Sequence, residues 1–277
     1  MIIDSHHHFW TYNAAEYGWI NDSMAALRRN FLADDLQKEM AHTGIDGAVS
    51  VEARQTVEET RWLLSLAEKN GFIKGVVGWV PLADGKVKGE IEKIATNRKL
   101  RGVRHGVQGE SDDQFILGRD FNRGVALLKD FGLVYDILIL ERHLPQTIEF
   151  VDLHPGQIFV LDHIAKPKIK EKSIEPWGKN IKELAKRENV YCKVSGMVTE
   201  ADLGNWNESQ LRPYFDTVLK AFGVKRLMFG SDWPVCLLAS TYVRWVEVVH
   251  RFAADLSKDE QARLFGGTAI EAYKLPV

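Results

Sequence analysis

Short apolar runs alternate with longer amphipathic segments along the whole chain. Short apolar runs bounded by polar residues are typical of buried strands, and the longer segments between them show helical patterns. The alternation predicts eight strands, over residues 2–5, 47–51, 73–80, 100–104, 133–138, 158–162, 190–194 and 226–230. Seven helices are predicted between the strands, over residues 34–42, 57–70, 89–97, 121–131, 144–153, 174–187 and 209–222.

Strands that alternate with helices are typical of βαβ units, which build parallel sheets. Eight such units favour a closed barrel over an open, doubly wound sheet. The chain has 277 residues and no linker rich in Pro, Gly or Ser, and single α/β barrels often contain about 250 residues. We therefore expect an α/β protein whose single domain, a (β/α)₈ TIM barrel, covers residues 1–277.

Composition and charge exclude several classes of protein. The net charge is −2 and the isoelectric point is about 6.5, so no basic surface indicates a nucleic-acid partner. The longest apolar runs are far shorter than the roughly 20 residues of a membrane span, and no signal peptide is evident at the N-terminus. No glycine-rich nucleotide-binding loop follows a predicted strand. The two cysteines form no disulfide framework and fit a reducing compartment, so we expect a cytoplasmic protein without nucleic-acid or membrane partners.

The first predicted strand leads into three consecutive histidines, His6, His7 and His8. Side chains two apart on a strand point to one side, so His6 and His8 present two imidazoles together while His7 points away. Such a pair suits a metal ion or a polarised carbonyl. Taken alone, His6 and His8 leave two alternatives open: a remnant of an expression tag, and two histidines hydrogen-bonded inside the core.

Polar residues stand at the C-terminal end of nearly every predicted strand, where the active sites of these barrels lie. Arg54 and Arg104 have two explanations that are equally good: ion pairs at the rim of the barrel, and contact with the substrate. The connection over residues 10–29 is long and aromatic, so we expect it to form a wall of the site. The residues at the strand ends include His6, His8, Arg54, Arg104, His163, Lys166, Lys193, Asp232 and Trp233.

Several blocks of sequence, taken in order, resemble the amidohydrolase superfamily, and within it the predicted barrel hydrolases that include sugar lactonases and a pyrone-dicarboxylate lactonase. The resemblance covers nearly the whole chain. The blocks are Asp4-Ser5-His6-His7-His8-Phe9-Trp10, Ala53-Arg54-Gln55, Val77-Gly78-Trp79-Val80, Arg101-Gly102-Val103-Arg104-His105, Leu161-Asp162-His163-Ile164-Ala165-Lys166-Pro167, Lys193-Val194-Ser195-Gly196 and Gly230-Ser231-Asp232-Trp233-Pro234.

The resemblance implies a distorted (β/α)₈ barrel and matches four residues to the superfamily's site. His6 and His8 match the histidine pair of strand one, His163 the histidine of strand six, and Asp232 the aspartate of strand eight. Metal-dependent members usually add a histidine on strand five or a modified lysine on strand four, and this chain has neither. His6, His8 and Asp232 are therefore expected to bind Zn²⁺ weakly, and no metal is expected to be required, since the lactonase branch can work without one.

Opening a lactone requires a base for water, a donor for the carbonyl oxygen and a proton for the leaving alkoxide. We assign the base to Asp232, and the hydrogen bonds to the developing oxyanion to His6, His8 and His163. Arg54, Arg104, Lys166 and Trp233 are expected to bind the substrate, a small neutral aldonolactone such as L-fucono- or L-rhamnono-lactone. The alternatives are a metal-dependent amidohydrolase or decarboxylase of the same superfamily, and a barrel that binds a sugar or a protein without catalysis.

Overall fold

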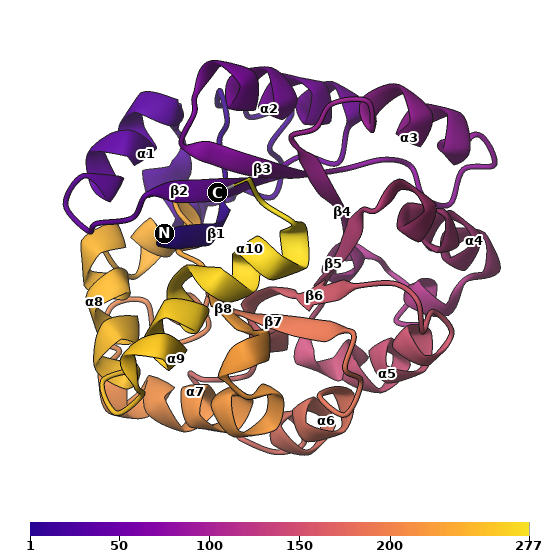
Figure 1. Cartoon of the computed structure of the whole chain (residues 1–277). Helices are drawn as coiled ribbons and strands as arrows, with labels where there is room; N and C mark the ends of the chain where they lie inside the picture. The colour runs from indigo at the N-terminus through magenta and orange to yellow at the C-terminus, as the bar shows by residue number, and fades with distance from the viewer. Residues whose placement is uncertain (277) are drawn as a thin grey trace.

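The computed structural model describes residues 1–276 as a ring of strands surrounded by helices (Figure 1). All eight strands are parallel and pair in the order of the sequence. This confirms the predicted α/β class and TIM barrel. The strands are β1 (Ile3–His7), β2 (Gly47–Val51), β3 (Ile73–Gly78), β4 (Leu100–Gly106), β5 (Val134–Leu138), β6 (Phe159–Leu161), β7 (Val190–Val194) and β8 (Leu227–Phe229).

The helices pack their apolar faces against the outside of the barrel, as their amphipathic patterns predict. Side-chain caps begin several of them: Thr56 accepts a hydrogen bond from the backbone of Glu59 at the start of α2. The helices are α1 (Ala33–Met40), α2 (Val57–Lys69), α3 (Val87–Ile94), α4 (Arg119–Leu128), α5 (Leu144–Asp152), α6 (Trp177–Leu184), α7 (Glu208–Phe222), α8 (Tyr242–Phe252), α9 (Lys258–Ala262) and α10 (Thr268–Tyr273). Short 3₁₀ helices join them, including η1 (Asp22–Leu27), η6 (Asp162–Ala165) and η8 (Val235–Leu238).

The barrel closes between its first and last strands through backbone contacts just beyond β8. The amide of Asp232 donates to the carbonyl of His6 (2.8 Å), and the amide of His8 donates to the carbonyl of Trp233 (2.7 Å). Asp4 is fully buried beside this seam and accepts from the amides of His6 (3.2 Å) and Ser231 (2.8 Å). The closure therefore fixes the histidine segment directly against the turn that carries Asp232.

The lower part of the barrel interior is apolar. Inward-facing side chains at the beginnings of the strands form one cluster with helix α10, which lies across this end of the barrel (Figure 1). The cluster includes Ile3, Val49, Val134, Val160, Met228 and Tyr273. The next inward positions along four strands carry Arg104, Asp136, Asp162 and Lys193, because residues two apart share a face.

No helix in residues 1–276 is both long and apolar enough to cross a bilayer. Both cysteines are free and buried.

Candidate active site

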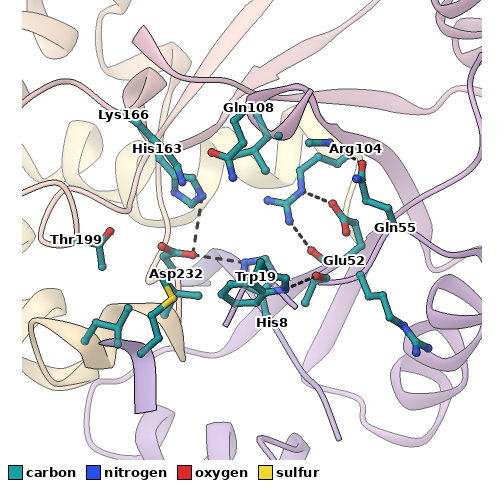
Figure 2. Close-up of a pocket in the computed structure, with 18 of the residues that line it drawn as sticks. His8, Trp19, Glu52, Gln55, Arg104, Gln108, His163, Lys166, Thr199 and Asp232 are labelled. Atoms are coloured by element: carbon teal, nitrogen blue, oxygen red, sulfur yellow. Dashed lines mark hydrogen bonds and ion pairs between the residues drawn. The ribbon is translucent and has the colours of Figure 1, made fainter. Parts of the chain in front are cut away.

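A cavity of about 580 Å³ opens at the C-terminal ends of the strands (Figure 2). Its wall combines carboxylates, amides and cations with a group of apolar side chains. The segment over residues 10–29 supplies part of this wall, as predicted. The lining includes His8, Glu16, Trp19, Met24, Glu52, Arg54, Gln55, Arg104, Gln108, Leu138, His163, Lys166, Thr199, Glu200, Leu203, Asp232, Val235 and Leu238.

Three imidazoles surround the carboxylate of Asp232. Its Oδ1 lies 3.4 Å from Nε2 of His8, 3.7 Å from Nε2 of His6 and 3.9 Å from Nε2 of His163. Burial alone would raise the pKa of Asp232, but His163, His8 and Lys166 together hold this pKa below its ordinary value. Asp232 therefore faces the cavity as an ionised carboxylate.

The backbone at Asp232 holds a conformation that side chains other than glycine rarely adopt, with φ of 57°. Its amide is bonded to His6 and its carbonyl accepts from the amide of Cys236 (2.9 Å). Strain that such contacts maintain is found most often where a side chain must be aimed for function.

His6 and His8 form a hydrogen-bonded pair, with 3.1 Å between their Nε2 atoms. Nδ1 of His8 lies 2.9 Å from the carbonyl oxygen of Val51, which can only accept, so Nδ1 carries a proton. Nε2 of His8 faces both Nε2 of His6 and Oδ1 of Asp232. His6 is fully buried, and burial holds its pKa well below the ordinary value, so it is neutral.

His163 reaches the cavity from a left-handed turn. Four consecutive residues, His163 to Lys166, have φ between 47° and 62°. Nδ1 of His163 lies 2.9 Å from the hydroxyl of Ser195, and a Cβ at Gly196 would approach that Nδ1 to 2.7 Å. Burial lowers the pKa of His163 to about 4, so the ring is neutral at pH 7. Within residues 1–276 Nδ1 of His163 is the one hydrogen-bond partner of the Ser195 hydroxyl, and Nε2 of His163 faces Asp232.

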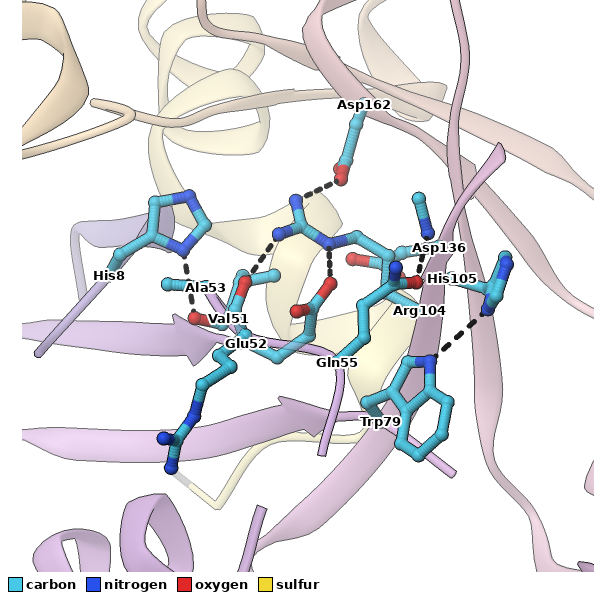
Figure 3. Close-up of polar contacts among 12 residues, drawn as sticks. His8, Val51, Glu52, Ala53, Gln55, Trp79, Arg104, His105, Asp136 and Asp162 are labelled. Carbon is cyan, nitrogen blue, oxygen red and sulfur yellow. Dashed lines mark hydrogen bonds and ion pairs between the residues drawn. The ribbon is translucent and has the colours of Figure 1, made fainter. Parts of the chain in front are cut away.

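Arg104 occupies the centre of a buried ionic network (Figure 3). Its Nε donates to Oε1 of Glu52 (2.8 Å), its Nη1 to Oδ2 of Asp162 (3.0 Å) and its Nη2 to the carbonyl of Glu52. Burial alone would lower the pKa of Arg104, but the two carboxylates raise this pKa above the ordinary value. The guanidinium is thus a permanent positive charge on the wall of the cavity.

Lys193 lies below this network, and its side chain is fully buried. Its Nζ donates to Oδ2 of Asp136 (2.6 Å), lies 2.9 Å from Oδ1 of Asp162, and contacts Nδ1 of His6 at 3.1 Å. The hydroxyl of Tyr273, on α10, donates to Asp136 (2.7 Å). Burial outweighs the effect of Lys193 and raises the pKa of Asp136 to about 6.

At the outer wall of the cavity, the segment over residues 10–29 contacts the loop that follows β2. Nε1 of Trp19 donates to the carbonyl of Ala53 (3.0 Å), and Nη1 of Arg54 lies 2.6 Å from Oε2 of Glu16. These contacts hold the segment over residues 10–29 against the end of β2, so that Trp19 covers one side of the cavity (Figure 2).

The structure brings six of the predicted site residues to the cavity wall and leaves two behind it. His6 lies beneath His8 and does not line the cavity. The ring of Trp233 is 1% exposed and packs edge-on against Phe31, with 5.3 Å between ring centroids. The residues on the wall are His8, Arg54, Arg104, His163, Lys166 and Asp232.

Arg54 and Arg104 each form an ion pair, and each also lines the cavity, so contact with a substrate stays a prediction for both. Sequence reasoning did not assign the amides of Gln55 and Gln108 or the carboxylate of Glu52 to the wall. The signal that could have found Gln55 is its place in the Ala53-Arg54-Gln55 block at the end of a strand. Gln108 follows β4 by two residues and carried no comparable signal.

The residues present fit a metal ion in donor type and spacing. His6, His8 and Asp232 each offer a ligand atom, and these atoms lie within 4.8 Å of one another. Imidazole and carboxylate ligands are those that Zn²⁺ prefers in catalytic sites. Oδ1 of Asp162 lies 3.3 Å from Nδ1 of His6 and receives no aligned hydrogen bond within residues 1–276, which suits the support of a metal-bound histidine.

The sequence profile of the amidohydrolase family matches residues 3–275 of the chain. This chain belongs to the amidohydrolase family. The amidohydrolase is 43% identical to an L-fucono-1,5-lactonase of Burkholderia multivorans, over 100% of this chain and 97% of that protein. It is 35% identical to an L-fucono-1,5-lactonase of Burkholderia ambifaria, over 99% and 95% of the two chains. A crystal structure of an amidohydrolase from Burkholderia multivorans with bound zinc superposes with a TM-score of 0.96, at 42% identity and 100% coverage of both chains.

Proposed function

We propose that this amidohydrolase hydrolyses a sugar lactone to the sugar acid, with L-fucono-1,5-lactone as the first candidate substrate. The observation that carries the proposal is an ionised Asp232 at the centre of three imidazoles on the wall of the cavity. The similarity to two L-fucono-1,5-lactonases over almost the full length supports the choice of substrate.

In the proposed reaction Asp232 takes a proton from water as the water oxygen attacks the carbonyl carbon of the lactone. The carbonyl oxygen becomes an oxyanion in the tetrahedral intermediate. The bond between the former carbonyl carbon and the ring oxygen then breaks, and the proton on Asp232 passes to that oxygen. Asp232 ends the cycle ionised, and the product is the open-chain acid.

The developing oxyanion needs donors that point into the cavity. We assign one of these donors to His163, in the tautomer that carries its proton on Nε2, and the positive charge of Arg104 lies on the same wall. One donor of this kind contributes about 3 kcal/mol to stabilising an oxyanion. His6 and His8 support the site as a hydrogen-bonded pair beside Asp232.

The cavity wall offers both polar and apolar contacts to a deoxy sugar. Gln55, Gln108 and Lys166 supply hydrogen-bonding groups for hydroxyls. Met24, Leu203, Val235 and Leu238 supply an apolar surface for a methyl group, as in a 6-deoxy sugar.

His6, His8 and Asp232 would hold Zn²⁺ if the ion binds, and a bound zinc ion would polarise the carbonyl as a Lewis acid. We propose that the hydrolysis of a lactone does not require this ion, because an activated ester needs less electrophilic assistance than an amide. The cationic Arg104 already stands on the wall, with Nη1 3.4 Å from Nε2 of His6. The predicted cytoplasmic location stays a prediction.

The test measures proton release on a panel of aldonolactones with chelator-treated protein, with Asp232→Asn and the exposed Asp255→Asn as matched control. We expect hydrolysis that resists chelation and a loss of about 10²–10⁴-fold in kcat/KM for Asp232→Asn only. If no lactone is hydrolysed, the proposed substrate class is wrong.

A metal-dependent amidohydrolase or decarboxylase is the second candidate, favoured by the spacing of His6, His8 and Asp232. It predicts that chelation abolishes activity and that added Zn²⁺ restores it. It also predicts turnover of amide or aromatic acid substrates in the same panel.

A further inference from the structure

Two polar side chains that follow β2, Glu52 and Gln55, line the cavity but take no part in the proposed bond-breaking steps. Residues of β4 hold both of them. Nε of Arg104 donates to the carboxylate of Glu52, and the backbone amide of Gly106 donates to the side chain of Gln55. These contacts fix which atom of each side chain is left for a ligand.

Glu52 keeps one carboxylate oxygen available. The residue is 2% exposed, and its Oε1 accepts from Nε of Arg104 at 2.8 Å (Figure 3). Within residues 1–276 the other oxygen, Oε2, receives no hydrogen bond, yet it is not fully enclosed. A carboxylate can only accept, and a buried acceptor without a donor is costly. Glu52 therefore offers the cavity an acceptor that a ligand can satisfy.

Gln55 offers a donor. A backbone N–H can only donate, so the amide atom that lies 2.8 Å from the nitrogen of Gly106 is the oxygen, Oε1. The amide nitrogen, Nε2, has no hydrogen-bond partner in the part of the chain that the structure describes. Gln55 is an exposed residue of the cavity wall, so its N–H groups are available to an acceptor on a ligand.

Each cation that lines the cavity already lies beside a carboxylate of the same wall. A carboxylate on a ligand would therefore meet cations that are paired and would also face Asp232, whereas a neutral hydroxyl can both donate and accept. The wall favours hydroxyl groups. The pairs are Arg54 with Glu16 (2.6 Å), Arg104 with Glu52 (2.8 Å) and Lys166 with Glu200 (4.0 Å).

We propose that Glu52 and Gln55 are specificity-determining residues that bind two hydroxyl groups of the substrate. Oε2 of Glu52 accepts from one hydroxyl, and Nε2 of Gln55 donates to the oxygen of another. The pair thereby selects a neutral, polyhydroxylated ring over one that carries a carboxylate. Arg104 joins this wall to the base, because its Nη1 lies 3.4 Å from Nε2 of His6, which lies 3.7 Å from Asp232. The inference rests on the proposed function, since it names the groups of the sugar lactone that the same site recognises.

Two substitutions remove the proposed contacts and keep the size of the side chains. Glu52→Gln leaves an oxygen for Arg104 but loses the ionised acceptor, and Gln55→Met loses the donor. The matched controls make the same changes at exposed positions that do not line the cavity: Glu58→Gln on α2 and Gln37→Met on α1.

Calorimetry with the δ-lactam of L-fuconic acid measures binding without turnover. We expect the Kd to rise at least about tenfold in Glu52→Gln and about three- to tenfold in Gln55→Met, because an ionised acceptor contributes more than a neutral donor. Both controls should keep the wild-type Kd. An analogue with a carboxylate in place of the methyl group should bind wild type at least about tenfold more weakly than the parent lactam.

Lactams that lack one hydroxyl assign each contact. In wild type, removal of a hydroxyl that the pair binds should weaken binding. In each variant the penalty for one hydroxyl should shrink at least about threefold, and this hydroxyl should differ between Glu52→Gln and Gln55→Met. The penalties for the remaining hydroxyls should stay as in wild type.

An unchanged Kd in either folded variant, an equal loss for every lactam, tight binding of the carboxylate analogue, or no binding of the parent lactam to wild type overturns the proposal. If Glu52→Gln does not fold, Glu52→Asp, which withdraws the carboxylate by one methylene, takes its place. If neither folds, the Gln55→Met series decides. Lactone hydrolysis with an unchanged lactam Kd in Gln55→Met would contradict this inference alone, and lactam binding that needs both residues without any hydrolysis would contradict the proposed function alone.

Discussion

The lower and upper parts of the barrel interior are built by the same strands and differ completely in chemistry. The lower part packs residues such as Val134, Val160 and Met228 against α10. The upper part, nearer the cavity, carries a group that we call the charged layer: Glu52, Arg104, Asp136, Asp162 and Lys193. From Val134 to Asp136, and from Val160 to Asp162, a shift of two positions separates a region that stabilises the fold from one that supports chemistry.

Burying the charged layer costs more free energy than burying the apolar lower part. Removing a charge from water costs several kcal/mol, and partners recover this only when their geometry is good. Each cation of the layer contacts two carboxylates: Arg104 contacts Glu52 and Asp162, and Lys193 contacts Asp136 and Asp162. Substitutions in the two parts should therefore have different effects on activity as well as on stability.

The largest effect is expected for Arg104→Met in the charged layer. The substitution leaves Glu52 and Asp162 buried without their cation, so the free energy of unfolding should fall by about 3–5 kcal/mol. The kcat/KM for the lactone should also fall at least about 100-fold, because a charge on the cavity wall is lost. Urea unfolding and proton-release kinetics measure the two effects. Exposed Arg98→Met is the matched control, and an unchanged kcat/KM in Arg104→Met would remove Arg104 from the reaction.

Met228→Ala in the lower part should separate stability from activity. The cavity left beside α10 should lower the free energy of unfolding by about 2–4 kcal/mol. At 25 °C the folded variant should keep kcat/KM within about threefold of wild type, since the Met228 side chain belongs to the lower apolar cluster and does not line the cavity. A large loss of activity at full folding would show that packing at the bottom controls the site.

The smallest effect is expected from a buried carboxylate that no cation accompanies. Glu59 accepts from the amides of Ala53 (3.0 Å) and Arg54 (2.6 Å) and from the hydroxyl of Tyr17 (3.2 Å). Burial, with a contribution from Glu52, raises the pKa of Glu59 to about 7. The folded protein therefore keeps a proton that the unfolded chain releases as the pH rises from about 4.5 to 7.

Stability should fall across this pH window in wild type, because ionising Glu59 is harder in the folded state. In Glu59→Gln this contribution is absent, so the variant should gain about 1–3 kcal/mol relative to wild type between pH 5 and pH 8. Urea unfolding at both pH values tests this. A constant difference between the two proteins would place the pKa of Glu59 near its ordinary value.

Much of the fold could be predicted from the alternation of apolar runs and amphipathic segments. The predicted strands over residues 47–51 and 190–194 have the bounds of β2 and β7. The predicted helix over residues 174–187 is shorter in the structure, where Pro176 precedes the first residue of α6. Helix α8 was not predicted: it contains several β-branched and aromatic residues, and its clearest signal is the cap at Thr241.

The candidate site could be predicted only as far as position along a strand reveals it. His8, His163 and Asp232 were found because they stand at strand ends. Lys193 lies inside the barrel and Trp233 lies outside the cavity. These places depend on the face of the sheet to which each side chain points. That choice follows from the register of the closed barrel and from the left-handed backbone at Asp232, which short-range patterns do not encode.

The guanidinium of Arg104 and the ammonium of Lys193 are positive charges that belong to the encoded side chains. Unlike a dissociable ion, they are present in every molecule at a fixed ratio, need no cellular supply, and are not lost on dilution or to a competing chelator. A protein that carries its cations in its own sequence also transmits them by inheritance, so selection can adjust them one codon at a time.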